Sequence, residues 1–377
     1  MEKQTIKNKI MEEFYWLHQH PELSYEEYET TARIKENLTT AGIRILDLPL
    51  QTGLVAEVGT GQKPIIAVRC DIDALPIQEK TVLEYRSQIP GKMHACGHDF
   101  HTATILGVAH LLKLRESELR GTVRIIFQPA EEAPGGAVKV IETGALEDVQ
   151  AIFGLHSSSV FKVGTVGIKA GAVTAAVDQF NIIFTGKGTH AAHPQDGIDP
   201  LATAAAFVSS AQSIISRNMN PFSPVLLSIT HFESGNTWNV IPETAYIEGT
   251  VRTLVPEDRV TVEKRLRIMA EHTAAAYGAE AAVQWISGPP ATINDEAWAA
   301  FAADTAIKCG LQVAESPESL GGEDFSFYQE KIKGVFIHIG TGESYPGHNP
   351  RFAVDPAALF PAAEYIASLA EQAFNRL

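Results

Sequence analysis

The chain has few cysteines and no long apolar segment. Its 377 residues include three cysteines, Cys70, Cys96 and Cys309, an odd number at wide spacing that does not suit a framework of disulfides. No apolar run approaches the ~20 residues that a membrane-spanning helix needs, and the first thirteen residues contain no continuous apolar stretch. We therefore expect a cytoplasmic protein that is neither exported nor embedded in a membrane.

Basic residues are also scarce. The chain has 30 Lys and Arg against 45 Asp and Glu, which gives a formal net charge of −15. Such a chain cannot neutralise a run of phosphates, and no stretch of Lys and Arg alternates with aromatic residues, so we exclude nucleic acid as a partner. Apolar residues, in contrast, make up 45% of the chain, which is enough to bury the cores of two domains.

The N-terminal part begins with helical patterns. Ser24 followed by Glu27 matches a capping box, which predicts a helix from there to about Ala41. An earlier helix over residues 5–18 is predicted by four apolar side chains at helical spacing, namely Ile6, Ile10, Phe14 and Leu17.

After residue 42 the pattern changes to short apolar runs, which indicate strands. Helical patterns over 101–114 and 137–144 fall between the runs at residues 53–58, 64–70, 121–128 and 151–156. The last three runs are nearly continuous in apolar residues, as strands covered on both faces require. This alternation predicts an α/β domain with a mixed, largely parallel sheet flanked by helices. Cys70 and Cys309 are expected to be buried core thiols.

Residues 179–288 have a different order of elements. A strand, a helix, two strands, a helix and a last strand follow one another there, the β-α-β-β-α-β order of a ferredoxin-like unit. Gly171 before this segment and Gly288-Pro289-Pro290 after it are typical of hinges. We therefore predict a ferredoxin-like α+β domain at 179–288, inserted into a catalytic domain that comprises residues 1–178 and 289–377.

Five potential metal ligands stand at the ends of predicted strands or in loops that contain Gly or Pro. Taken singly, a Cys, His or Glu is more often structural than a ligand. Together they combine thiolate, imidazole and carboxylate, the donors of a transition-metal site, and an apolar core does not collect such groups. The carboxyl ends of parallel strands meet at one edge of a sheet, so these side chains are predicted to converge. They are Cys96, His98, Glu132, His156 and His348.

Glu131 lies beside Glu132, after a predicted buried strand. Viewed alone, the pair fits an exposed helix start equally well. Beside a metal, two adjacent carboxylates can take different roles. We expect Glu132 to bind the ion and Glu131 to take a proton from a metal-activated water. Asp71 and Asp73 end another strand with their side chains on one side, so at least one is expected to orient a ligating histidine; the alternative is a cap or a surface turn.

Seven segments, spread in order over nearly the whole chain, carry a further signal. They are His18-Gln-His-Pro-Glu-Leu-Ser, Arg69-Cys-Asp-Ile-Asp-Ala-Leu-Pro, Met93-His-Ala-Cys-Gly-His-Asp, Phe127-Gln-Pro-Ala-Glu-Glu, Gly186-Lys-Gly-Thr-His-Ala-Ala-His-Pro, Asn239-Val-Ile-Pro-Glu-Thr and Gly321-Gly-Glu-Asp-Phe. Together they resemble the amidohydrolase branch of the aminoacylase and carboxypeptidase metallopeptidases. That branch includes hippurate hydrolases, indole-acetyl-amino-acid hydrolases and N-acetyl-diaminopimelate deacetylases.

The resemblance implies a metal-dependent hydrolase that cleaves the amide bond of N-acyl amino acids with an acetyl or aromatic acyl group. It implies two divalent ions on the five ligands above, with Glu131 as general base. The softness of a thiolate favours zinc, nickel or cobalt, and carboxylate and water ligands leave manganese open. Where the wider clan has His-x-Asp, this chain has Asp71-x-Asp73, and Cys96 is expected to be the ligand that both ions share.

The resemblance also implies that the inserted domain is a lid that forms a homodimer. His190 would then reach the active site, commonly that of the partner subunit, and would stabilise the oxyanion together with the ions. Asn239 and Arg252 match positions that contact substrate. A fixed charge at Arg252 suits the carboxylate of an amino acid, although an arginine in a strand is often only part of an ion pair.

Three other interpretations stay open from the sequence. The same mechanism would serve a peptidase or carboxypeptidase that acts on dipeptides. Cys96 with a neighbouring histidine would serve as a nucleophile, in which case chelators would leave activity intact. A metal-stabilised binding protein without catalysis would keep the ligands but would have no use for Glu131 or for a hinged lid.

Overall fold

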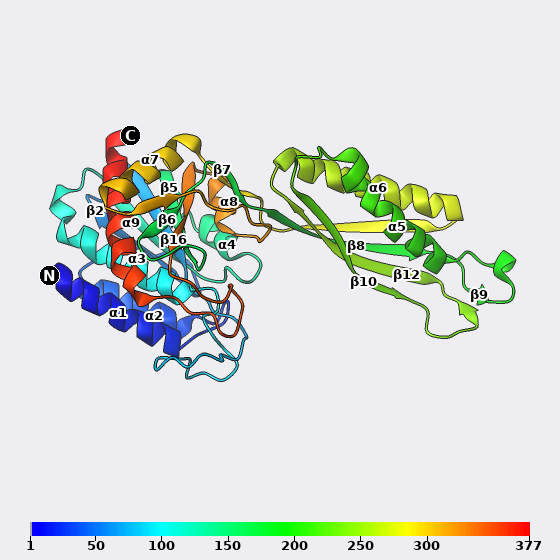
Figure 1. The fold of residues 1–377 in the computed structure, drawn as a ribbon, viewed down its shortest axis with the longest axis horizontal. Helices are drawn as coiled ribbons and strands as arrows, with labels where there is room; N and C mark the ends of the chain where they lie inside the picture. Colours follow the sequence, from blue (N-terminus) through cyan, green and yellow to red (C-terminus); the bar gives the residue numbers. More distant parts are fainter. Residues whose placement is uncertain (1) are drawn as a thin grey trace. The chain divides into compact units, whose positions relative to one another are not determined.

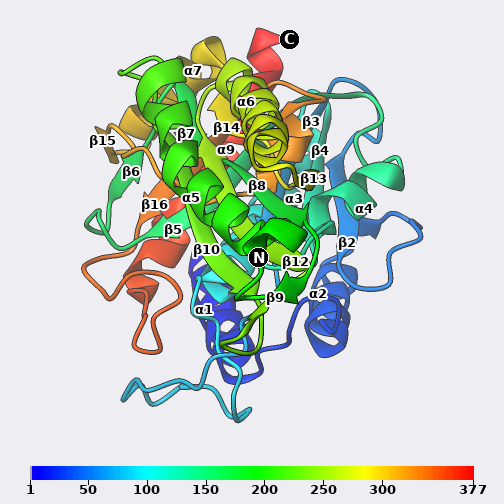
Figure 2. The ribbon, with the colours of Figure 1, turned by 90° about the vertical axis from the view of Figure 1, so that its right-hand side faces the viewer.

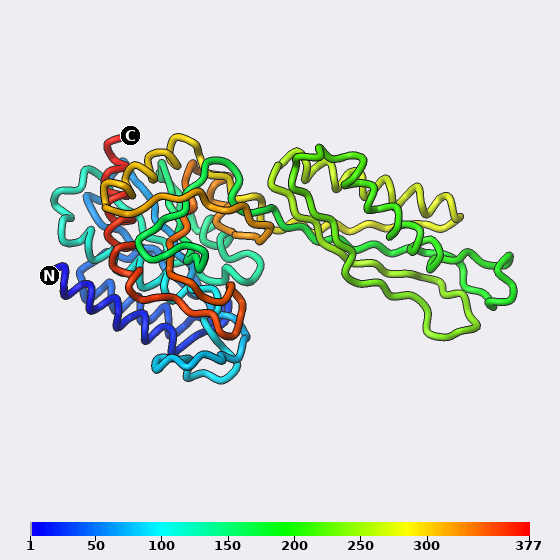
Figure 3. The backbone as a smooth tube through the Cα atoms, viewed as in Figure 1, coloured from blue at the N-terminus to red at the C-terminus, as the bar shows by residue number. Residues whose placement is uncertain are grey.

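The computed structural model describes residues 2–377, which form two compact units (Figure 1). The first unit contains the chain up to Val173 together with Ile293–Pro317 and Asp324–Leu377. The second unit contains Thr174–Thr292 and Glu318–Glu323. Figure 3 follows the chain from the first unit into the second and back.

An eight-stranded mixed sheet organises the first unit. Its strands are β1 (Arg44–Ile45), β2 (Leu54–Gly59), β3 (Ile65–Asp71), β4 (Thr122–Gln128), β5 (Val149–Ser158), β6 (Thr165–Gly167), β15 (Gln312–Ala314) and β16 (Gly334–Gly340). They lie in the order β1-β2-β4-β3-β5-β16-β6-β15, and the central run from β4 to β16 is parallel. Strands β1, β2 and β6 add antiparallel pairs on either side. The predicted α/β class with a mixed, largely parallel sheet is confirmed.

Helices cover both faces of this sheet because its strands bury side chains in both directions. Ile66 and Val68 of β3 pack into one apolar cluster and Ile65 and Ala67 into another. The helices are α1 (Lys3–Gln19), α2 (Tyr28–Thr40), α3 (His98–Leu114), α4 (Gly136–Glu142), α7 (Glu296–Lys308), α8 (Phe325–Gln329) and α9 (Leu359–Ala373). Helices α1, α2, α3, α7 and α9 belong to the first cluster, and α4 and α8 to the second.

The second unit contains a four-stranded antiparallel sheet in the order β10-β12-β8-β13. In Figure 2 its two helices lie over this sheet, and side chains from both helices fill one apolar cluster with those of the strands. Its elements follow the β-α-β-β-α-β order: β8 (Ala176–Thr185), α5 (Pro200–Asn218), β10 (Val225–Ser234), β12 (Thr244–Thr253), α6 (Pro256–Tyr277) and β13 (Glu280–Ser287). Two smaller sheets pair β9 (Thr189–His190) with β11 (Val240–Ile241), and β7 (Gly171–Thr174) with β14 (Thr292–Asn294).

The predicted capping box at Ser24 and Glu27 is wrong. Helix α2 begins at Tyr28, and its first amides are capped instead by the carboxylate of Glu22, which accepts hydrogen bonds from the N–H groups of Glu29 and Thr30 at 3.1 and 2.8 Å. Ser24 and Glu27 make long-range hydrogen bonds, which a local sequence pattern cannot reveal.

The prediction for Cys309 is also wrong. Cys70 is buried in the core, but Cys309 is exposed, because α7 ends at Lys308 and the thiol lies just beyond the packed part of the helix. Among the helices of residues 2–377, none combines the length and the apolar character needed to span a membrane.

Candidate metal centre

The candidate ligands of the first unit gather at the carboxyl edge of its parallel strands. Strand β3 ends at Asp71, β4 ends three residues before Glu131, and His156 lies near the end of β5. Because β4, β3 and β5 are parallel neighbours, their ends lie side by side. The loop that enters α3 and the loop after β16 bring the remaining candidates to the same edge.

Cys96, His98 and His156 form the core of the cluster, with their ligand atoms all within 4.8 Å of one another. The Sγ atom of Cys96 lies 3.4 Å from Nε2 of His156. The other ring nitrogen of His156 donates a hydrogen bond of 2.7 Å to the carbonyl of Ser157, so the ring is held with Nε2 toward the thiol. Gly97 permits this approach: its φ is 87°, and a Cβ there would lie 2.3 Å from Oγ of Ser157.

His98 opens helix α3 and is fully buried between carboxylates. Its Nδ1 lies 3.3 Å from Oδ1 of Asp73, while Nε2 lies 3.8 Å from Asp71 and 4.0 Å from Glu131. Nε2 has no hydrogen-bond partner within residues 2–377. Burial alone would lower the pKa of His98. The charge of Asp71 and the hydrogen bond to Asp73 nevertheless raise this pKa well above its ordinary value. The environment of Nε2 therefore attracts a cation.

Asp71 belongs to a buried polar network behind His98. Arg69, fully buried, donates to Asp71 at 2.7 Å and to Asp324 at 2.6 Å. Ser157 donates its N–H to Nε2 of His101 at 2.7 Å, so the Nδ1–H of that ring donates to Asp71 at 2.6 Å. Burial opposes ionisation, but His98, His101 and Arg69 hold the pKa of Asp71 well below its usual range. Asp71 thus supplies a fixed negative charge.

Glu132 and His348 complete the cluster. Oε1 of Glu132 lies 3.0 Å from Nε2 of His348, and both have ligand atoms within 4.8 Å of Cys96. Glu132 raises the pKa of His348 above its ordinary value. His348 has a left-handed backbone with a φ of 65°, and its N–H donates to the carbonyl of Ala95 at 2.8 Å, which ties it to the loop of Cys96.

Glu131 shares this site and is mostly shielded from solvent, with 13% of its side chain exposed. The carboxylate of Asp73 accepts the N–H groups of Glu131 and Glu132, both at 3.0 Å. The carboxylate of Glu131 lies in a ligand group with His98 and Glu132. It is therefore within reach of a water at the ligands.

The donor set fits divalent transition metals. Thiolate, imidazole and carboxylate are the ligands that such ions take, and the unpartnered, buried Nε2 of His98 is aimed at the cluster. Burial raises the pKa of the Cys96 thiol, and a cation at the cluster would reverse that shift by stabilising the thiolate. Cys96, His98, Glu132, His156 and His348 would hold the ions.

The remaining predicted site residues lie in the second unit. His190 is exposed in β9, and its Nδ1 accepts the N–H of Ala192 at 3.0 Å, which leaves Nε2–H as a free-standing donor in the neutral ring. Asn239 precedes β11, the strand that pairs with β9, and its carbonyl accepts the N–H of Ala191. Arg252 lies apart from them in β12, half-buried, and donates to the hydroxyl of Thr250.

Sequence reasoning assigned no role to several buried histidines of this region, among them His101 and His18. His101, described above, lies behind the cluster. His18 of α1 contacts Asp99 at 2.6 Å and Glu79 at 3.3 Å. Burial alone would lower the pKa of His18, but these two carboxylates raise it to about 9. His18 and Asp99 both lie in motifs that the sequence analysis quoted, a signal that could have identified them.

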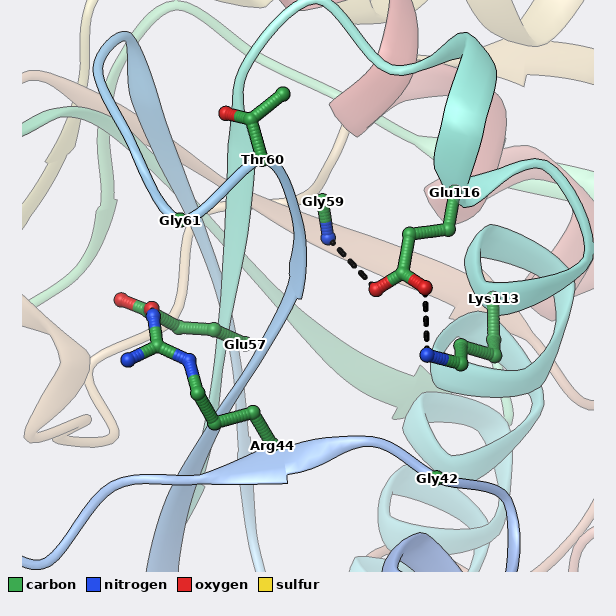
Figure 4. A pocket seen from close by; sticks show the side chains of 8 residues that line it. All are labelled: Gly42, Arg44, Glu57, Gly59, Thr60, Gly61, Lys113 and Glu116. Carbon is green, nitrogen blue, oxygen red and sulfur yellow. Dashed lines mark hydrogen bonds and ion pairs between the residues drawn. The ribbon is translucent and has the colours of Figure 1, made fainter.

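A separate pocket lies at the opposite end of the sheet (Figure 4). It is close to Gly59, which pairs with Thr122 at the start of β4, whereas the cluster lies beyond the end of β4. Its charged groups pair with one another, Arg44 with Glu57 and Lys113 with Glu116. The lining residues include none of the candidate ligands: Gly42, Arg44, Glu57, Gly59, Thr60, Gly61, Lys113 and Glu116.

Comparisons with known proteins show the family of this chain. The model of the family described as Peptidase family M20/M25/M40 matches residues 67–372. N-acetylcysteine deacetylase of Bacillus subtilis (strain 168) is 49% identical over 356 residues, which cover 94% of each chain. The IAA-amino acid hydrolase ILR1-like 5 of Arabidopsis thaliana is 38% identical over 365 residues, covering 94% of this chain and 84% of its own.

A solved structure is similar over almost the full length. It is that of the Bacillus subtilis YXEP protein, described as a dinuclear metal binding peptidase from the M20 family. It superposes with a TM-score of 0.91 at 44% sequence identity and covers 99% of this chain and 100% of its own.

Proposed function

The chain belongs to peptidase family M20/M25/M40, and from that premise we propose that this amide-bond hydrolase deacylates N-acyl amino acids, with N-acetyl amino acids as its preferred class. The observation that carries the chemistry is the position of Glu131. It lies beside the cluster of ligands without being one of the five, on a loop whose amides are bonded to Asp73.

Cys96, His98, Glu132, His156 and His348 would hold two divalent ions, and such ions when bound would activate a water and polarise the acyl carbonyl. Glu131 takes a proton from the water as its oxygen attacks the acyl carbon. When the C–N bond breaks, Glu131 returns that proton to the leaving amine nitrogen. Manganese, zinc, nickel and cobalt all suit the mixed donor set, and Cys96 would be among the residues that hold them.

The second unit is proposed to act as a lid and to form a homodimer. His190 suits the growing oxyanion because its Nδ1 is occupied as an acceptor and its Nε2–H is left to donate. Asn239, next to the strand that pairs with β9, and Arg252 are proposed to contact substrate, with Arg252 on the amino-acid carboxylate. The three unpaired cysteines support a cytoplasmic location.

The preference for an acetyl group is supported by the relatives. Two Bacillus subtilis relatives, 49% and 48% identical to this chain, are named as deacetylases of N-acetylcysteine, whereas the Arabidopsis thaliana hydrolases of IAA-amino acids are 37–39% identical.

A panel of substrates tests this proposal. Release of the free amine is measured with N-acetyl-L-cysteine, other N-acetyl amino acids, N-benzoyl and indole-acetyl conjugates, and dipeptides, each with Mn²⁺, Zn²⁺, Ni²⁺ or Co²⁺. We expect the highest kcat/KM for N-acetyl amino acids. A higher value for aromatic acyl conjugates or for dipeptides would contradict the proposed substrate class.

A further inference from the structure

The loop that carries Glu131 and Glu132 presents three consecutive backbone N–H groups, those of residues 130, 131 and 132. Two of them are taken by Asp73, as described above. The third, that of Ala130, donates to Oε1 of Glu27 at 2.8 Å. A buried backbone N–H needs a hydrogen-bond acceptor, and here Glu27 supplies the acceptor that a strand or helix would otherwise provide.

Ala130 has an unusual backbone conformation. Its φ is 54°, in the left-handed region that residues with a Cβ disfavour, and its side chain is fully buried. Such a conformation persists only where the surroundings impose it. Glu131 and Glu132 follow directly, so their backbone continues from this conformation of Ala130.

Space behind the loop is closed as well. A Cβ on Gly136 would lie 2.3 Å from the carbonyl oxygen of Ala130, so this carbonyl packs tightly against the start of α4. Glu27 thus binds the N–H of Ala130, and the start of α4 packs against the carbonyl of Ala130.

Glu27 itself is held in place by the segment that precedes α2. The carbonyl of Glu22 accepts the N–H of Ala74 at 2.8 Å, and Oγ of Ser24 donates to Asp73 at 2.6 Å. The hydroxyl of Tyr25 donates to the carbonyl of Pro134 at 2.6 Å, at the far end of the loop. Residues 22–27 therefore touch both Asp73 and the loop.

We propose that Glu27 is a positioning residue: its carboxylate holds Ala130 in the left-handed conformation and thereby sets the orientation of Glu131 and Glu132. The catalytic consequence of this role rests on the proposed function. The hydrogen bond by which Glu27 holds the loop does not. Glu27 belongs to none of the groups of candidate ligands found among residues 2–377. It acts through the backbone of the loop.

A matched pair of substitutions isolates the effect of the hydrogen-bond acceptor at position 27. Glu27→Gln keeps the shape and an acceptor oxygen, whereas Glu27→Met keeps a similar volume but has no acceptor for the N–H of Ala130. Both remove the carboxylate charge, so a difference between them reports the hydrogen bond. A third variant, Glu27→Met with Ala130→Gly, removes the strain that drives Ala130 out of the left-handed region.

Three readouts are needed: kcat and KM with an N-acetyl amino acid, metal content after dialysis, and amide hydrogen exchange of residues 128–136. We expect Glu27→Met to lower kcat about tenfold or more, since small misplacements of catalytic groups have such effects, with a smaller change in KM. Exchange in the loop should be about tenfold faster than in Glu27→Gln, because the loop opens more often. Ala130→Gly should restore part of kcat in the Glu27→Met background.

Equal kcat and equal loop exchange in Glu27→Met and Glu27→Gln would overturn the proposal, and so would a loss in Glu27→Met that Ala130→Gly leaves unchanged. A wild-type protein inactive on every acyl amino acid would contradict the proposed function instead. In that case the exchange rates still decide whether Glu27 holds the loop.

Discussion

Asp73 lies 3.3 Å from Nδ1 of His98, and this contact fixes which nitrogen of the imidazole faces the cluster. The same buried carboxylate accepts the backbone N–H groups of Glu131 and Glu132. One side chain thus orients a proposed ligand and the loop that carries the proposed base. Groups of this kind act on metals through the ligands that they hold.

The substitution Asp73→Asn tests this shared role. An amide offers one acceptor oxygen and presents an NH₂ group to backbone N–H donors, so at least one hydrogen bond is lost and His98 is held less firmly. We expect metal affinity to fall about 10–100-fold. Competition with a chelator measures it, and an affinity equal to wild type would contradict the role of Asp73.

Cys96 and Cys70 form a matched comparison. Cys96→Ala removes a proposed ligand, so metal content after dialysis should fall. Cys70→Ala removes a thiol buried in the apolar core, so it should lower the free energy of unfolding and leave the metal content unchanged. Elemental analysis measures the metal content of both proteins. Full metal occupancy in Cys96→Ala would show that Cys96 is not a ligand.

His18 should make stability depend on pH. Its pKa is raised to about 9 in the folded protein from 6.5, so its protonated form stabilises the fold by on the order of 3 kcal/mol below pH 6.5. That stability is lost as the pH rises through about 9. The carboxyl of Asp99, with a lowered pKa, adds stability that is lost only in acid.

The variant His18→Gln is the control for this effect. Its deficit in free energy of unfolding, from urea titrations of metal-free protein, should be large at pH 6 and shrink toward pH 9.5. A deficit that is constant across this range would show that His18 is not charged in the fold.

Much of the first unit could be predicted because its strands are locally distinctive. Runs such as residues 64–70 and 121–128 are nearly continuous in apolar residues, and the structure has strands there. Strand β16, Gly334–Gly340, carries a similar apolar run but was not identified, although it pairs with β5 in the centre of the sheet.

What could not be predicted depends on partners far away in the sequence. Ser24 and Glu27 fit a capping box locally, yet their partners, Asp73 and Ala130, lie 49 and 103 residues away. The same holds for Arg69, whose bond to Asp324 spans 255 residues. Local patterns predicted that Asp71 or Asp73 orients a histidine, but they missed the positioning contacts of Glu27 and Arg69.

Subunit mixing tests whether His190 acts across a dimer. His190→Ala is expected to lower kcat rather than raise KM, because the imidazole is proposed to act on the charge of the transition state. His190→Ala and Glu131→Gln proteins are combined under conditions that exchange subunits. A hybrid dimer with one intact site should recover part of the activity, and no recovery despite confirmed exchange would exclude catalysis in trans.

The central claim is that Glu131 is the base and Glu132 a ligand at a centre with two divalent ions. Metal content and kcat, measured together on Glu131→Gln and Glu132→Gln, test it most directly. Glu131→Gln should keep about two ions per chain and lose on the order of 10²–10⁴-fold in kcat, whereas Glu132→Gln should lose metal. Near-normal turnover by Glu131→Gln, or full metal occupancy in Glu132→Gln, would contradict the account.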